Sequence, residues 1–161
     1  MASVWTTIRD EINSRLENIS IANGYSKDIS TIEKGRVSPF EDNDLPGINF
    51  WKTDDLSESR SYTRQSRTLR MGFEYYTLSN DDDIDTISDN FMTDLFIALY
   101  RAPSAPLVTD DPLPMFADKN FLMVFDVLRP IISQGSTPRV GLFAIISFTY
   151  MINNLDPNTL I

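Results

Sequence analysis

The first part of the chain carries apolar residues at helical spacing. They recur every three or four positions, with charged residues largely between them: Trp5, Ile8, Ile12, Leu16 and Ile19. This spacing lines one face of an α-helix. Ser3 can cap the start of that helix, and Gly24 supplies the left-handed residue that ends it.

A second helical pattern covers residues 80–102. Its apolar positions form one face and comprise Ile84, Ile87, Phe91, Met92, Leu95, Phe96 and Leu99. Aspartates at 81–83 and 85 lie at its start, where the helix dipole and the free N–H groups favour negative charge. Pro103 closes the segment.

Three segments between these helices have the patterns of strands. A short polar segment at 28–37 has Ile29 and Ile32 as its apolar anchors. The β-branched and aromatic residues of 48–53 are typical of a strand. At 66–79, apolar and polar residues alternate with a period of two, which predicts a strand with two different faces.

The last part of the chain predicts a hairpin. Residues 119–128 and 139–152 are apolar on both faces for much of their length, and turn residues separate them. They are expected to form a central pair of strands. Long loops are expected at 54–66, which is polar, and at 103–118, which is rich in proline.

The order of elements is therefore α-β-β-β-α-β-β, within a single domain spanning residues 1–161. It predicts an α+β fold in which two helices pack on one face of a mainly antiparallel sheet. The apolar residues on the second face of the hairpin suggest that another copy, or another protein, covers that face.

Composition excludes several kinds of chemistry. The 161 residues include no cysteine and no histidine, which removes disulfides, zinc sites built on thiolate or imidazole, and histidine-based triads. The aspartates at 81–85 lack EF-hand spacing, and no phosphate-binding glycine loop occurs. The carboxylate pairs 42/44 and 110/111 sit beside prolines, where solvated turn aspartates are common. We expect no enzyme activity, no metal and no cofactor.

Membrane insertion and export are also not expected. The longest apolar run, at 140–152, is shorter than a bilayer-spanning helix requires. The amino terminus lacks the basic start and apolar run of a secretory signal, so the protein should remain where it is made.

Four arginines stand out against the acidic composition: Arg60, Arg64, Arg67 and Arg70. The chain has 14 basic and 23 acidic side chains and a formal net charge of -9; without these four arginines, 10 against 23 leaves -13. With nearby tyrosines they resemble a single-strand nucleic-acid site. The alternative is a basic segment that docks on an acidic protein surface, such as a neighbouring copy of the same chain.

The layout resembles a known family. Three features resemble that family. The amphipathic first helix is followed by Gly24-Tyr25, a short strand ends at Gly35-Arg36, and the segment 45–48 (LPGI) leads into the next strand. This arrangement is similar to tail terminator (tail-completion) proteins of long-tailed siphophages, lambda-like or T-five-like. The present chain is longer than the lambda-like pattern, mainly at 54–66 and 103–118.

The resemblance implies a structural protein of the virion. Such proteins assemble in the host cytoplasm as a ring, typically hexameric, at the head-proximal end of the tail tube. The ring stops tube polymerisation and receives the head-completion or neck protein, and DNA passes through it as cargo. On this basis, Phe121, Phe125 and Phe143 are candidates for packing between subunits, with ordinary core positions as the alternative. The segment 54–70, which contains the four arginines, is the candidate contact with the tail-tube protein or the adjacent subunit. A neck protein, a head-completion protein or a minor tail protein is the nearest other function.

Overall fold

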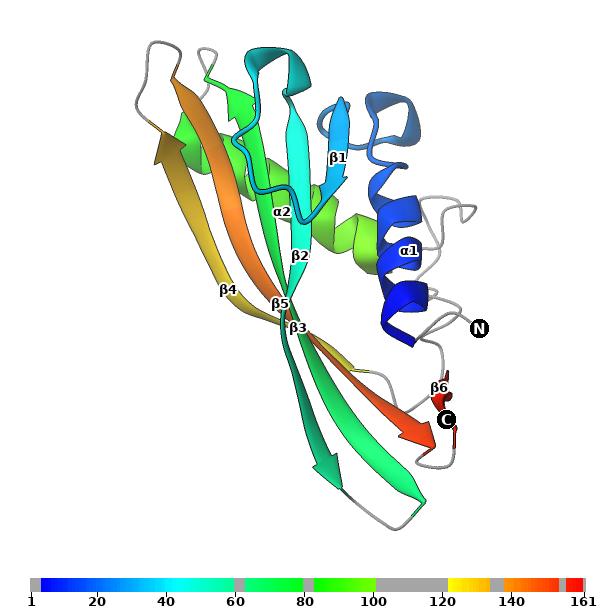
Figure 1. Ribbon diagram of the computed structural model, residues 1–161. Coiled ribbons are helices and arrows are strands. Elements are labelled where there is room, and N and C mark those ends of the chain that lie inside the picture. Colours follow the sequence, from blue (N-terminus) through cyan, green and yellow to red (C-terminus); the bar gives the residue numbers. More distant parts are fainter. Residues whose placement is uncertain are drawn as a thin grey trace.

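The computed structural model describes residues 4–59, 63–79, 83–100, 122–133, 138–153 and 156–160. Two helices and a mixed sheet make an α+β fold, as the sequence predicts (Figure 1). In chain order the elements are α1 (Val4–Leu16), η1 (Ile21–Asn23), β1 (Thr31–Lys34), η2 (Asp42–Asp44), β2 (Gly47–Ser59), β3 (Arg64–Leu78), α2 (Ile84–Tyr100), β4 (Leu122–Ser133), β5 (Arg139–Asn153) and β6 (Asp156–Leu160).

The strands lie side by side in the order β1-β2-β3-β5-β4, and β6 pairs with the end of β5. Only β1 and β2 run parallel among these pairs, and the other pairs are antiparallel. The observed order therefore contains a last strand, β6, that the sequence analysis did not predict.

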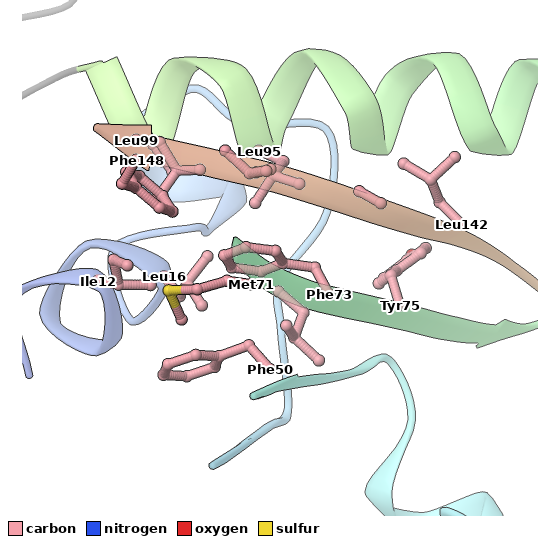
Figure 2. Close-up of a cluster of buried hydrophobic side chains, with 14 of the residues drawn as sticks. Ile12, Leu16, Phe50, Met71, Phe73, Tyr75, Leu95, Leu99, Leu142 and Phe148 are labelled. Carbon is pink, nitrogen blue, oxygen red and sulfur yellow. The ribbon is translucent and has the colours of Figure 1, made fainter. Parts of the chain in front are cut away.

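One apolar core joins the helices to the sheet. Alternate residues of β3 are buried in it, beginning with Leu69. Figure 2 shows the next three, Met71, Phe73 and Tyr75, pointing into this core. Their partners on β5 are also buried at alternate positions, and Leu95 and Leu99 of α2 pack against them. Burial of each such large side chain contributes roughly 1.5–3 kcal/mol. The period of two predicted for 66–79 is thus confirmed.

The two helix boundaries show how local chemistry sets an end. Asp83 lies before the first turn of α2 and accepts hydrogen bonds from the backbone N–H of Thr86 at 2.8 Å and from its hydroxyl at 3.0 Å. These bonds hold the pKa of the Asp83 carboxyl below its ordinary value. By contrast, α1 ends at Leu16, before the expected glycine; Gly24, at a φ of 85°, instead ends the short turn η1.

The prediction of a long loop at 54–66 is wrong. Strand β2 continues to Ser59 and β3 begins at Arg64, so most of this range is paired strand. Much of this paired segment is exposed, so its residues are polar. A polar segment of this kind has the same composition as a surface loop. A register shift between Lys52 and Asp54 interrupts the ladder but does not end it. The other expected loop, 103–118, lies outside the described residues.

The hairpin prediction is partly confirmed. Strands β4 and β5 pair antiparallel, and β5 lies between β3 and β4. However, β4 lies at the end of the strand order rather than at its centre. Its apolar residues are correspondingly open, with Ile132 60% exposed and Val124 44% exposed. An apolar run alone does not distinguish a buried strand from an edge strand that has an exposed apolar surface.

Candidate interaction surface

The sheet has a face that points away from the core. Register places Trp51, Gly72, Ile145 and Val127 side by side across four strands, and these residues alternate with core residues of β3 and β5. We name this surface the outer sheet face, and its members include Trp51, Leu56, Arg70, Val124, Val127, Arg129, Phe143 and Ile145.

An aromatic row with a cation lies at the middle of the outer sheet face. Arg129 is paired with Phe143 in the ladder, and its Cζ atom lies 4.8 Å from the centroid of the Phe143 ring. The ring of Trp51 lies 6.3 Å from that of Phe143. Gly72 makes this possible, because a Cβ atom there would lie 2.6 Å from the indole of Trp51. The position of the Trp51 ring beside Phe143 therefore depends on the glycine at position 72.

Several apolar side chains of the outer sheet face remain open to solvent. Leu56 is 56% exposed, and Val127 is 37% exposed. Arg129 is exposed, and among the described residues no carboxylate lies within 4.0 Å of its guanidinium. Exposed apolar residues next to arginine and aromatic rings have the composition of a protein interface.

The four predicted arginines do not form one cluster. Arg64 and Arg70 share one face of β3 because they are six residues apart, whereas Arg67 lies on the opposite face. Arg67 binds Asp55 through two bonds of 2.7 and 3.0 Å. Arg70 lies 3.6 Å from Asp126, while Arg60 is outside the described residues. The charges of Arg67 and Arg70 are therefore balanced within the subunit.

The three predicted phenylalanines also lie in different places. Phe125 is partly buried on the core side and stacks on Phe96 of α2 at 5.4 Å. Phe143 lies on the outer sheet face, next to Trp51. Phe121 is outside the described residues. Of these candidates, Phe143 is the one that the structure places on the outer sheet face.

A depression of about 330 Å³ opens between residues 36–40 and the end of the sheet. Two arginines line it, but Arg36 binds Asp44 at 2.9 Å and Arg139 binds Asp42 at 2.7 Å. The Asn49 side chain accepts from the backbone N–H of Arg36 and donates to its carbonyl, which holds the segment in place. These contacts show a tethered loop whose cations are already paired.

Two carboxyls next to these features have raised pKa values. Burial raises the pKa of Glu74, which lies beside Asn49 at the depression. Burial also raises the pKa of Asp94 on α2, although the hydroxyl and backbone N–H of Ser26 donate to this carboxyl. The Asp94 contacts tie the segment after η1 to α2. In the described part of the chain, no three acidic side chains gather as a metal site would need.

Sequence reasoning missed Trp51 and Arg129. Trp51 lies in the predicted strand 48–53, whereas Arg129 directly follows the strand predicted at 119–128, and their placement near each other depends on strand order. The available signal was weak: a glycine inside the alternating strand 66–79 indicates a close approach by another group.

Comparison with known proteins gives no family for this chain: no protein-family model matches it, and no curated protein matches it either. Within the described residues, neither helix has the length and apolar character needed to cross a membrane.

Proposed function

We propose that the protein is a structural, non-enzymatic tail terminator of a siphophage. In this proposal its copies form a ring, hexameric by the resemblance described above, at the head-proximal end of the tail tube. The ring stops tube polymerisation and receives a head-completion or neck protein. The observation that carries the proposal is the outer sheet face, where Trp51, Phe143 and Arg129 lie together beside exposed valines.

The fold supports a ring-forming role in a second way. The proposal includes both helices covering one face of the sheet, so that the opposite face is left for contacts between subunits. Support comes from the core, which joins residues of α1, α2, β3 and β5 in a single cluster. A single sheet covered on one side leaves an apolar surface that association can bury.

The charge balance suits a passage for DNA. The net charge of -9 gives the subunit a field that repels phosphates. In a ring of such subunits, a negatively charged lumen would let DNA pass through without binding to the wall.

The hairpin of β2 and β3 is the proposed contact with the tail tube or the adjacent subunit. Figure 1 shows the far ends of β2 and β3 extending beyond the helices. Arg64 lies on this arm and is exposed. The Arg67–Asp55 pair stiffens the arm across its two strands.

Electron microscopy of the purified protein mixed with tail tubes tests the proposal. We expect rings at one end of the tubes, and tails of abnormal length when the protein is absent during assembly. Normal-length tails that fail to join heads would instead assign the protein to the neck. A protein that stays monomeric and leaves the tubes bare would refute the proposal.

A single-stranded nucleic-acid binder is the second candidate function. The stack of Arg129 on Phe143 beside Trp51 favours it, because such sites combine cations with aromatic platforms. Fluorescence binding to an oligonucleotide at about 50 mM salt tests it, because phosphate contacts are strongest at low salt. Absence of binding under those conditions would remove this candidate.

A further inference from the structure

The outer side of α2 carries negative charge and an exposed phenylalanine. Asp85, Asp89, Thr93 and Phe96 are spaced by three or four residues and are all exposed, so they line one helical face. Phe96 is 48% exposed, although its ring also stacks on Phe125 of the same subunit. The sequence of α2 contains no lysine and no arginine. This acidic face therefore combines a negative surface with one apolar anchor.

Register places three acidic residues on the outer sheet face, Asp54, Glu58 and Glu74, but the middle of this face around Arg129 has the opposite character. It presents the guanidinium of Arg129, held over Phe143, with Val127 exposed beside it. In Figure 1, α2 crosses the sheet on one side, and the register above places the outer sheet face away from the core. One subunit therefore presents complementary surfaces on two of its sides.

We propose that these two surfaces bind each other in neighbouring copies of the chain. Asp89 and Phe96 of one copy contact Arg129, Phe143 and Val127 of the next. This inference rests on the proposed function and names the surfaces that join the subunits. Each copy then uses both surfaces once, which is a head-to-tail contact, and such contacts close into a ring when the rotation between copies permits.

Charge decides between this arrangement and its nearest alternative. In a symmetric contact between two outer sheet faces, the carboxylate next to Phe143 would be Glu74, which is only partly exposed, whereas Asp89 on α2 is exposed. The acidic face of α2 instead supplies a carboxylate to a cation that has none nearby in the described subunit. Arginine and aromatic residues in such positions commonly carry most of an interface's binding energy.

Charge reversal on each surface tests the contact. Arg129→Glu and Asp89→Arg change exposed side chains, so both variants should fold, as circular dichroism can verify. We expect each variant alone to assemble at least about tenfold more weakly than wild type. Glu17→Arg makes the same reversal at an exposed site after α1 and should assemble normally. Native mass spectrometry and electron microscopy, with tail tubes present where they are needed, measure the assembly.

Recovery gives the decisive result. We expect the double variant Arg129→Glu/Asp89→Arg to regain assembly, because each contact again joins opposite charges. A mixture of the two single variants should also recover, since alternating copies match at every contact. Wild-type rings together with normal assembly of Asp89→Arg, or no recovery in either case, would overturn this inference alone. An Arg129→Glu variant that assembles normally but loses oligonucleotide binding would also overturn it. A wild-type chain that forms no rings on tubes refutes the proposed function instead.

Discussion

Gly72→Ala perturbs the tightest packing point of the outer sheet face. A Cβ atom at this position would lie 2.6 Å from Cζ2 and 2.7 Å from Cε2 of Trp51, whereas carbon atoms in favourable contact are about 3.5–4.0 Å apart. The backbone at Gly72 lacks the positive φ found at Gly24 and Gly35. Steric conflict with the indole, rather than backbone conformation, therefore limits this substitution.

Two opposing effects set its magnitude. Alanine in place of glycine inside a strand stabilises by roughly 0.5–1 kcal/mol. Overpacking costs roughly 1–3 kcal/mol, and moving the Trp51 ring away from Phe143 forfeits an aromatic contact of about 0.5–1.5 kcal/mol. The two losses together exceed the gain, so we expect Gly72→Ala to lower the free energy of unfolding by about 2 kcal/mol.

Urea unfolding followed by circular dichroism measures this change, and Trp51→Leu supplies the control background. Without the indole the conflict disappears, so Gly72→Ala should there be neutral or stabilising. The chain has two tryptophans, and a Trp5→Phe background isolates the emission of Trp51, which should shift when the ring moves. Equal destabilisation in both backgrounds, or no change in stability and emission, would refute the reasoning.

Three further changes test other contacts. Leu95→Ala empties a fully buried site and should cost about 2–5 kcal/mol in urea unfolding, whereas Phe96→Ala at the exposed neighbour should cost about 1 kcal/mol; equal costs would contradict the assigned burial. A double-mutant cycle of Arg67→Ala and Asp55→Ala should give a coupling energy of about 1 kcal/mol, and a value near zero would show that the pair does not stabilise the arm. Asp94→Asn removes a carboxyl whose pKa is raised by burial. The native state binds the proton more tightly at Asp94, so wild-type stability falls as pH rises from the ordinary carboxyl pKa through the raised one. The stability of Asp94→Asn relative to wild type should therefore increase as pH rises above the ordinary carboxyl pKa of about 4, and a pH-independent difference would contradict this assignment.

Much of the candidate surface depends on which residues the fold places side by side. Sequence reasoning identified Phe143 from its apolar strand. It grouped four arginines by their proximity along the chain, yet Arg64 and Arg70 share a face of β3 that Arg67 does not. Strand geometry separates such neighbours because successive side chains point to opposite faces. Arg129 joins Phe143 only because β4 pairs with β5 in this register.

The sequence by itself determined the elements whose signals are local. The helical spacing of α2, the carboxylate at its start and the alternation that buries Met71 and Phe73 all depend on residues a few positions apart. The tertiary structure alone decided what depends on distant segments. The polar residues after Asp54 form a paired strand, because the backbone of β3 supplies the hydrogen bonds that a loop would make with water. The tertiary structure also placed β4 outside β5, which leaves Val127 and Arg129 exposed on the outer sheet face.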